Sequence, residues 1–248
     1  MKLFVVGANS PTGKHFVEQL RKKRISFLAP SRTQFFPENA MVIAKLVTEY
    51  APTQLVNLTD FISGNHSALR RAETAEDRCR SVNTLLPATL AEIANHLNVP
   101  MVHLSNAYVF DGEKKLGYNE NDEVNPLGIY GGATYEGERA VSDHNAHIII
   151  RSGWLFGRWK KGLIKSWIRS FKRNEGHLQL TRRRFSPTHT GDLANATLSS
   201  KKIFDTFGIK QKSWHGHLQD VIKLLYEGRT RQSASKRAAD SAATTDAA

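Results

Sequence analysis

A turn with glycine at both ends, Gly7 to Gly13, carries the first chemical signature in the chain. It follows a short apolar run, residues 2–6, and precedes a segment with helical periodicity. In that context the first glycine permits a tight turn, the last lets the helix pack closely on a sheet, and N–H groups at the helix N-terminus bind a pyrophosphate. The middle position, usually glycine, is Ser10, whose hydroxyl either donates to a phosphate or crowds it, and a plain strand-to-helix turn is the alternative interpretation. The predicted dinucleotide contacts are Gly7, Asn9, Ser10, Pro11, Thr12 and Gly13.

A residue just past the second predicted strand helps to decide which dinucleotide is bound. An acidic side chain at this place binds the ribose 2′-hydroxyl of NAD, whereas arginine suits the 2′-phosphate of NADP. Arg32 stands here, and between Gly13 and Glu38 the only acidic residue is Glu18, inside the predicted helix. The sequence therefore favours NADP(H) over NAD(H), with Arg32 as a cofactor contact.

Strands alternate with helices along the first 151 residues. This order is typical of βαβ units with right-handed crossovers, so we expect an α/β fold, a Rossmann-type doubly wound parallel sheet. The predicted strands are residues 2–6, 25–29, 54–58, 100–105 and 147–151, and the predicted helices are 11–24, 40–50, 68–80, 82–97 and 130–144.

Beyond residue 151 the pattern loosens and the charge changes. The chain carries a net charge of +12, and residues 158–184 hold ten Lys or Arg side chains against Glu175 alone. This segment is either a solvated basic helix face or a surface for an anionic partner. Its aromatic residues fall at helical spacing, which is more typical of a core than of base stacking, so nucleic acid is not an expected partner. We predict three units: an NADP(H)-binding domain at 1–151, a small basic substrate lobe with C-terminal helices at 152–228, and a disordered tail at 229–248.

Other features exclude whole classes of protein. No apolar run approaches the roughly 20 residues that cross a bilayer, and the opening run is too short for a signal peptide. The single cysteine, Cys79, permits no internal disulfide, which is typical of a reducing compartment. No His/Cys cluster has the spacing of a metal site. We expect a cytoplasmic protein with no metal and no membrane partner.

One stretch has the character of a family signature. It contains the segment Ser105-Asn106-Ala107-Tyr108-Val109-Phe110-Asp111-Gly112, then Asn125-Pro126-Leu127, Tyr130-Gly131 and Gly137-Glu138. With Asn57 to Phe61, Val82-Asn83, Arg151 to Gly157 and Ser186-Pro187-Thr188, it resembles the dTDP-4-dehydrorhamnose reductase family over roughly residues 1–227. Members are extended short-chain dehydrogenases that reduce the 4-keto group of a nucleotide-linked 6-deoxyhexose in rhamnose or polysaccharide biosynthesis.

The resemblance implies a set of site residues. The family pairs a Thr or Ser with a Tyr and with a Lys four residues later, which maps onto Asn106 (with Ser105 before it), Tyr130 and Thr134. Tyr130, Ser105 and Asn106 are thus the catalytic candidates, and Thr134 stands where the family has lysine. The implied cofactor contacts are Thr59, Asp60, Asn83 and Thr134, and the implied substrate contacts are Tyr108, Phe110, Trp154 and Arg183.

The resemblance also implies a mechanism and leaves an alternative open. In such a reductase NADPH gives hydride to C4, and a tyrosine protonates the carbonyl oxygen, with a lysine lowering its pKa. Here Lys114 or Lys115 would have to replace that cation, or the tyrosine acts without one. If lysine loss limits turnover, Thr134→Lys is expected to raise it. The lobe after Asp192 is several dozen residues shorter than in typical members. The alternative is a non-catalytic nucleotide-binding or regulatory relative, and either form is compatible with a homodimer.

Overall fold

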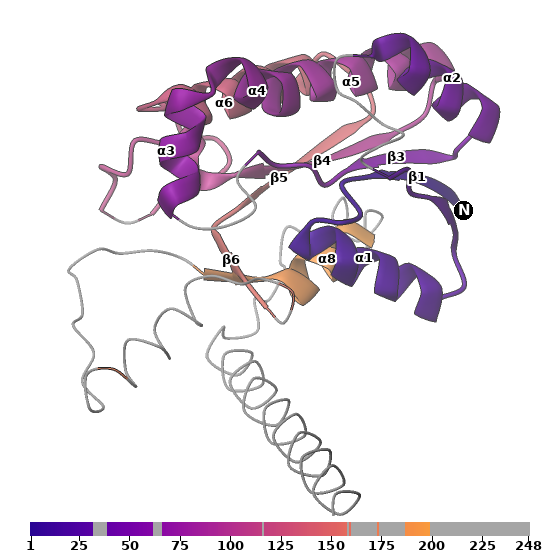
Figure 1. The fold of residues 1–248 in the computed structure, drawn as a ribbon, viewed down its shortest axis with the longest axis horizontal. Helices are drawn as coiled ribbons and strands as arrows, with labels where there is room; N and C mark the ends of the chain where they lie inside the picture. The colour runs from indigo at the N-terminus through magenta and orange to yellow at the C-terminus, as the bar shows by residue number, and fades with distance from the viewer. Residues whose placement is uncertain are drawn as a thin grey trace, which may run out of the picture.

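A computed structural model describes residues 1–31, 39–61, 66–115, 117–157, 159, 173 and 187–198. Its centre is a five-stranded parallel sheet with the strand order β2-β1-β3-β4-β5 (Figure 1). The strands are β1 (Lys2–Val6), β2 (Ser26–Leu28), β3 (Gln54–Asn57), β4 (Met101–Asn106) and β5 (His147–Ser152). The chain runs outward from β1 to β2 on one side and resumes on the other side with β3, so the topological switch lies between β1 and β3. Ligands of open α/β sheets bind at this kind of crevice.

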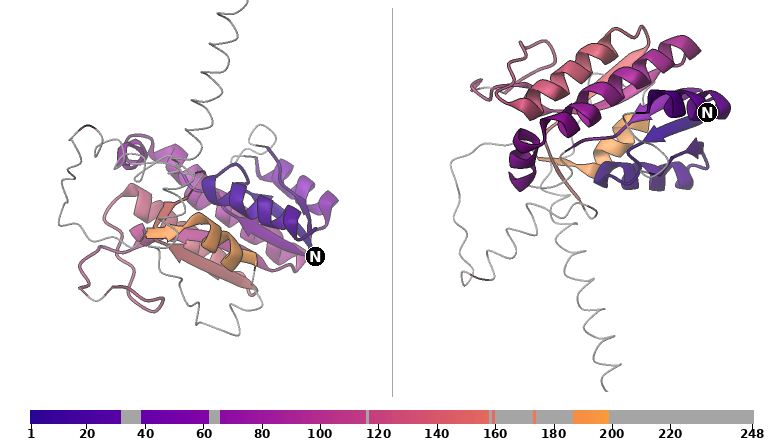
Figure 2. Two further views of the ribbon diagram at one scale, coloured as in Figure 1. Left: turned by 90° about the horizontal axis from the view of Figure 1, so that it is seen from below. Right: turned by 45° about the horizontal axis from the view of Figure 1, so that its top comes forward.

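Helices cover both faces of the sheet. One face carries α1 (Pro11–Lys22) and α8 (Thr190–Leu198), which lie side by side in both views of Figure 2. The other face carries α2 (Ala40–Tyr50), α5 (Leu86–Leu97) and α6 (Ile129–Ser142). The short helices α3 (His66–Thr74) and α4 (Glu76–Arg80) pack against the N-terminal part of α6. The expectation of a doubly wound parallel sheet is confirmed.

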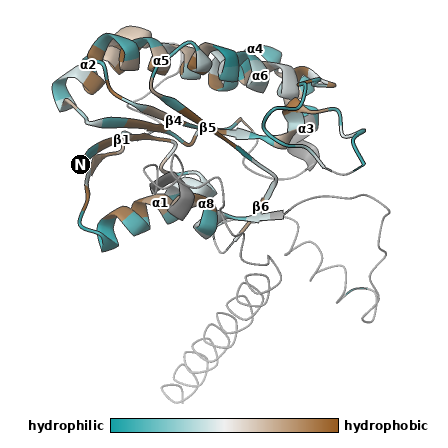
Figure 3. Ribbon diagram, turned by 180° about the vertical axis from the view of Figure 1, so that it is seen from behind, coloured by the Kyte–Doolittle hydropathy of each residue, from teal (hydrophilic) through white to brown (hydrophobic). Residues whose placement is uncertain are grey.

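The core explains why β1 reads as a continuous apolar run. Successive side chains of a strand point to opposite faces, and here both faces are covered. Phe4 packs with Ile43 and Val47 of α2, whereas Val5 packs with Phe16 of α1. Figure 3 shows the same pattern, with hydrophobic strands between helices whose outer turns are hydrophilic.

The start of α1 follows from its sequence. Ser10 is the N-cap, and its hydroxyl accepts a hydrogen bond from the Gly13 N–H at 2.9 Å. Pro11 occupies the first helical position, where a missing N–H costs nothing. Arg21 and Lys22 lie in the last turn, where cations stabilise the negative end of the helix dipole.

The chain after β5 holds elements that the sequence analysis did not predict. β6 (Trp154–Phe156) pairs in parallel with β7 (Pro187–His189), and α8 follows directly. Leu193 and Ala194 of α8 join the same core cluster as Phe16, so this part of the predicted lobe packs on the first domain. The basic segment 158–184 apart from Trp159 and Arg173, the part of the predicted lobe after residue 198, and the predicted tail 229–248 lie outside the described residues. The proposed boundary after residue 151 stays a prediction.

No helix within the described ranges is long and apolar enough to cross a bilayer.

Candidate active site

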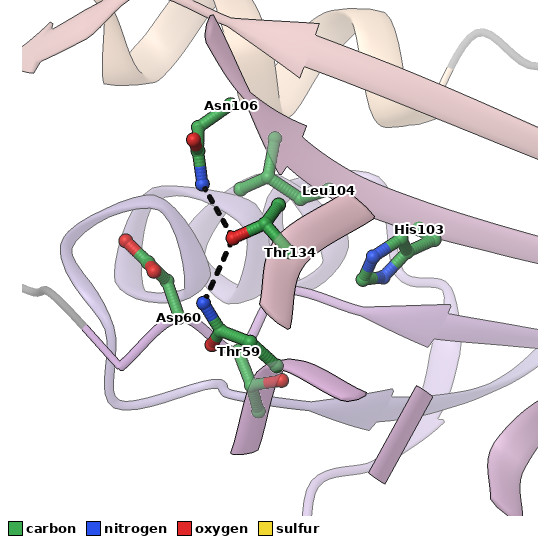
Figure 4. Close-up of a pocket in the computed structure, with 7 residues that line it drawn as sticks. Thr59, Asp60, His103, Leu104, Asn106 and Thr134 are labelled. Carbon is green, nitrogen blue, oxygen red and sulfur yellow. Dashed lines mark hydrogen bonds between the residues drawn. The ribbon is translucent and has the colours of Figure 1, made fainter. Parts of the chain in front are cut away.

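Polar side chains from four segments meet at the carboxyl edge of the sheet. Thr59 and Asp60 follow β3, Asn106 ends β4, Thr134 lies on α6, and Asn83 lies in a π-helical turn, η1 (Ser81–Leu85). Together with His103 and Leu104 these five side chains line one pocket (Figure 4). The sequence analysis named all five, so the fold brings together residues that are up to 75 positions apart, Thr59 and Thr134 being the most distant pair.

The phenol of Tyr130 has a hydrogen-bond partner on each side. Its hydroxyl donates to Asp60 Oδ1 at 2.7 Å and accepts from Asn106 Nδ2 at 2.8 Å. The Tyr108 ring stands edge-on to the Tyr130 ring, with the centroids 5.3 Å apart. Burial first, and then the charge and hydrogen bond of Asp60, raise the pKa of Tyr130 well above its ordinary value. The phenol therefore keeps its proton throughout the neutral range.

Thr134 is one helical turn after Tyr130 and is integrated into the same network. Its hydroxyl donates to the Tyr130 carbonyl oxygen at 2.8 Å. It accepts from Asn83 Nδ2 at 3.0 Å and from Asn106 Nδ2 at 3.4 Å, the two dashed lines of Figure 4. The residue is only 3% exposed. The position at which the resemblance implies a lysine is thus a buried acceptor for two amide groups.

Both amides are fixed in orientation by backbone donors. The Phe61 N–H donates to Asn83 Oδ1 at 3.0 Å, and the Tyr108 N–H donates to Asn106 Oδ1 at 3.0 Å. Each amide must therefore present its NH₂ group to Thr134. Because Asp60 and Phe61 are consecutive, the bonds close a ring that joins the loop after β3, η1, the end of β4 and α6.

Two glycines of α6 let these elements approach. A Cβ at Gly137 would lie 2.0 Å from the Asn83 carbonyl oxygen, and a Cβ at Gly131 would lie 2.3 Å from the Tyr108 carbonyl oxygen. Any side chain at either position would push η1 or the 3₁₀ turn η2 (Ala107–Val109) away from the helix. The glycines thereby set the distance from Thr134 to Asn83.

The glycine turn lies against the end of β3. Gly7 has a φ of +82°, and a Cβ there would lie 2.5 Å from the Leu58 carbonyl carbon. Ser10 accepts from Gly13, which leaves the hydroxyl hydrogen of Ser10 able to donate to a phosphate. The Thr12 hydroxyl is buried with no hydrogen-bond partner among the described residues. A crowded glycine cradle and an orphaned hydroxyl at a helix N-terminus fit a pyrophosphate. Arg32, the predicted contact to the 2′-phosphate, lies outside the described residues.

Ser105 takes part in a different interaction from the other catalytic candidates. Its hydroxyl donates to Glu138, whose carboxylate also accepts from Arg151 Nε at 2.9 Å and from Arg151 Nη2 at 2.7 Å. Glu138 is 2% exposed, and the Arg151 guanidinium lies over the Phe110 ring at 5.1 Å. Sequence reasoning missed this ion pair, although an arginine at the end of the apolar run 148–150 was a signal that a buried partner exists.

The implied substrate residues divide into two groups. Burial raises the pKa of the Tyr108 hydroxyl, and a hydrogen bond with the Trp154 side chain lowers it by a smaller amount. These two residues therefore lie together beside Tyr130, whereas Phe110 stacks on Tyr118 with the ring centroids 4.3 Å apart. Arg183 lies outside the described residues. Lys114, a candidate replacement for the missing cation, forms an ion pair with Asp122 at 2.6 Å.

Comparison with known proteins fits this geometry. The model of the RmlD substrate binding domain family matches residues 1–223. The chain belongs to the RmlD substrate binding domain family. A dTDP-4-dehydrorhamnose reductase of Sinorhizobium fredii is 28% identical to this RmlD family member, over 94% of this chain and 81% of its own.

Solved structures agree with the assignment. A crystal structure of a dTDP-4-dehydrorhamnose reductase from Clostridium acetobutylicum is 29% identical, with a TM-score of 0.75, and the match covers 91% of this chain and 80% of that one. The reductase of Bacillus anthracis, solved in complex with NADP, has the same fold, with 24% identity and a TM-score of 0.69 over 83% of this chain and 70% of that one. The RmlD family relationship therefore covers the sheet and the polar pocket at its edge.

Proposed function

We propose that this protein reduces the 4-keto group of a dTDP-linked 6-deoxyhexose with NADPH, a step of deoxysugar biosynthesis. The observation that carries the proposal is the position of the Tyr130 hydroxyl. It is hydrogen-bonded to Asp60 and Asn106, two residues that line the polar pocket at the carboxyl edge of the sheet, in a chain whose relatives are named dTDP-4-dehydrorhamnose reductases. A protonated phenol at such a place supplies a proton to a developing alkoxide.

The cofactor assignment combines the glycine turn with the relatives. The bound nicotinamide would supply a hydride to the sugar carbonyl carbon. The pyrophosphate would lie on the N-terminus of α1, where Ser10 donates its hydroxyl hydrogen and Gly7 and Gly13 keep the backbone close. We propose NADP(H) because Arg32 follows β2 and because a solved relative binds NADP.

The substrate would meet the aromatic residues next to Tyr130. Tyr108 contacts Tyr130 directly and is joined to Trp154, so both are placed to contact a sugar whose carbonyl reaches the phenol. Asn106 donates to the phenol oxygen and thereby fixes the phenol for proton transfer. Ser105 is engaged by Glu138, so we assign the polar catalytic role to Asn106 rather than to Ser105.

A second function is favoured by Thr134. With no lysine at this position and with the phenol hydrogen directed at Asp60, the same fold suits a protein that binds the nucleotide without turnover. This non-catalytic relative is the alternative that the experiment must separate.

A homodimer and a cytoplasmic location complete the proposal. The dimer follows from the resemblance to the family and the location from the single cysteine, and sedimentation of the full chain tests the dimer.

The test is reduction of a dTDP-4-keto-6-deoxyhexose, followed as loss of NADPH absorbance and formation of the 4-hydroxy product. Turnover should fall by about 10²–10⁴-fold in Tyr130→Phe, with NADPH affinity unchanged. Tyr50→Phe on α2 removes a hydroxyl far from the pocket and should leave turnover intact. NADPH binding with no turnover by the wild type would select the non-catalytic alternative.

A further inference from the structure

The Asp60 carboxylate accepts the hydrogen bond of the Tyr130 hydroxyl, the group proposed to protonate the substrate, but the proposed reduction gives Asp60 itself no role. We propose that Asp60 is the proton-relay partner of Tyr130: the Asp60 carboxylic acid passes its proton to the phenol oxygen as the phenol passes its own to the substrate. This inference deepens the proposed function and depends on it. Asp60 acts through Tyr130 and is therefore a positioning and relay residue.

The hydrogen-bond geometry makes the state of Asp60 decisive. A phenol has one hydrogen to donate, and the structure directs that of Tyr130 to Asp60 Oδ1 at 2.7 Å. While Asp60 is a carboxylate, the phenol hydrogen is engaged and cannot be donated to a ketone. Once Asp60 is protonated, the direction of the bond reverses and the phenol hydrogen becomes available. Asn106 Nδ2, at 2.8 Å from the phenol oxygen, holds the ring in place in both states.

The relay balances in atoms and electrons. The electron pair that reduces the carbonyl carbon arrives with the hydride of the proposed cofactor. On the oxygen side the phenol O–H bond breaks and a new O–H bond forms on the substrate, while the Asp60 O–H bond breaks and its proton moves to the phenol oxygen. The products are the sugar alcohol, the oxidised cofactor, a neutral Tyr130 and an Asp60 carboxylate, which takes up one proton (H⁺) from the solvent before the next turnover.

The surroundings favour a concerted transfer over a free phenolate. The groups that act on Tyr130 are Asp60, Tyr108 from η2 and Cys79 from α4, and all of them raise its pKa. Glu73 of α3 acts on the buried Cys79, and Arg80 is held by Glu76 and Glu136. Thr134 brings no charge. A phenolate would be costly here, so a proton that leaves Tyr130 must be replaced at once, and the nearest carboxyl group bonded to the phenol is Asp60.

The first test is the pH profile of kcat in Asp60→Asn. The amide keeps a hydrogen bond to the phenol but has no proton to pass on. We expect kcat to fall at least about tenfold, with the KM for NADPH within about twofold of the wild type. The wild-type kcat should decline as the pH rises, because an ionised Asp60 has no proton to pass to the phenol. This decline with pH should be absent in Asp60→Asn and present again in Asp60→Glu. Asp143→Asn, an exposed change after the end of α6, is the matched control.

The second test does not need turnover. Ionisation of Tyr130 is measured as the ultraviolet difference absorbance between a protein with Tyr130 and the matching Tyr130→Phe variant. Asp60→Asn should lower the pKa of Tyr130, because the negative charge of Asp60, which opposes formation of the phenolate, is removed. Asp111→Asn removes the carboxylate that accepts from Tyr118 and should leave the Tyr130 ionisation in place. Thermal melting of each variant verifies its fold.

The outcomes are distinct. An unchanged kcat and pH limb in Asp60→Asn overturns the relay, and so does a rise in kcat, which would mean that Asp60 only diverts the phenol proton. An unchanged Tyr130 ionisation overturns the coupling itself. Absence of wild-type turnover together with an altered ionisation overturns the proposed reduction and the relay within it, while it leaves Asp60 as the partner that sets the phenol's pKa.

Discussion

The amide of Asn83 donates to the hydroxyl of Thr134 across 3.0 Å and joins a π-helical turn to the helix that carries Tyr130. Single π-turns inside α-helices frequently occur at functional sites. This one lies between α4 and α5 and brings Asn83 to α6, where the carbonyl of Asn83 contacts the Gly137 backbone. Thr134, where the resemblance implies a lysine, accepts hydrogen bonds from two amides, and this changes what its substitution is expected to do.

Thr134→Lys should destabilise the fold and should not raise turnover. The side chain is 3% exposed and faces the NH₂ groups of Asn83 and Asn106, both of which donate. An ammonium group cannot accept a hydrogen bond, so Asn83 Nδ2 would lose its acceptor in the core, which costs about 1–3 kcal/mol, and the longer side chain would have to fit into a packed site. Denaturant unfolding and the NADPH assay measure the two effects. A stable Thr134→Lys variant with tenfold higher turnover would instead show that lysine loss alone limits the reaction.

Smaller changes at the same position separate hydrogen bonding from size. Thr134→Ser keeps the acceptor, so we expect stability near that of the wild type. Thr134→Val keeps the shape but leaves Asn83 Nδ2 without its acceptor, which should cost about 1–3 kcal/mol of unfolding free energy. Equal stability of the serine and valine variants would mean that the Asn83 bond contributes nothing.

The glycines of α6 offer a matched series. A Cβ at Gly137 or Gly131 would lie within 2.3 Å of a backbone carbonyl oxygen, whereas at Gly132 nothing lies within 4 Å. Gly132→Ala should therefore stabilise the helix by about 0.5–1 kcal/mol, and Gly137→Ala should destabilise it by about 1–3 kcal/mol and weaken the site by displacing Asn83. Thermal melting of the two alanine variants checks the order, and a stabilising Gly137→Ala would contradict the close approach of Asn83 to the helix.

The sequence predicts the parts of this fold whose signals are local. β1 follows from its apolar run, and the bounds predicted for α2 are those observed, since Asn39 caps its start and a left-handed Ala51 ends it. β6 and β7 were missed because two strands of three residues, more than 30 positions apart, have no periodicity to detect. α8 was also missed; its Leu193 and Ala194 are buried in the same core cluster as Phe16 and Leu20 of α1.

Prediction of the candidate site from the sequence has the same limit, since only local signals can be detected. A glycine turn and a Tyr-Gly motif reveal themselves by type and spacing, so Gly7, Gly13 and Tyr130 could be named from the sequence. The partner of a side chain cannot be named in this way, because it depends on which segments the sheet brings together. Asp60 was assigned to the cofactor, yet it accepts from a phenol 70 residues later.

The Arg151–Glu138 pair should behave as a buried ion pair. The Glu138 side chain is 3% exposed and that of Arg151 is 25% exposed, so Arg151→Met leaves a carboxylate in the core. We expect a loss of about 3–5 kcal/mol, of which a large part should return in the double variant Glu138→Gln/Arg151→Met, because the charge without a partner is then removed. A double-mutant cycle by urea unfolding measures this, and additive losses would show that the two side chains do not interact.

His103 should make the stability of the fold depend on pH between about 6.5 and about 4. Asn57 Oδ1 accepts from the backbone N–H of Thr59 at 3.1 Å and from its hydroxyl at 2.6 Å, so the NH₂ group of Asn57 must face His103 Nδ1, at 3.1 Å. That nitrogen is an acceptor, and the ring is neutral. Burial lowers the pKa of His103 to about 4. The unfolded chain, with a histidine pKa of about 6.5, therefore binds more protons in this window, and the unfolding free energy falls as the pH falls.

Between pH 7 and pH 4 the expected loss is about 3 kcal/mol, which is most of the full difference between a pKa of about 6.5 and one of about 4 at about 1.4 kcal/mol per pH unit. The measurement is urea unfolding at a series of pH values between 7 and 4 for the wild type and for His103→Gln, which has an acceptor for Asn57 but cannot take up the proton. The loss of stability on acidification should be smaller in the variant by about that amount, and His96→Gln, an exposed change on α5, should follow the wild type. Parallel curves for the wild type and His103→Gln would mean that His103 is not held neutral by the fold.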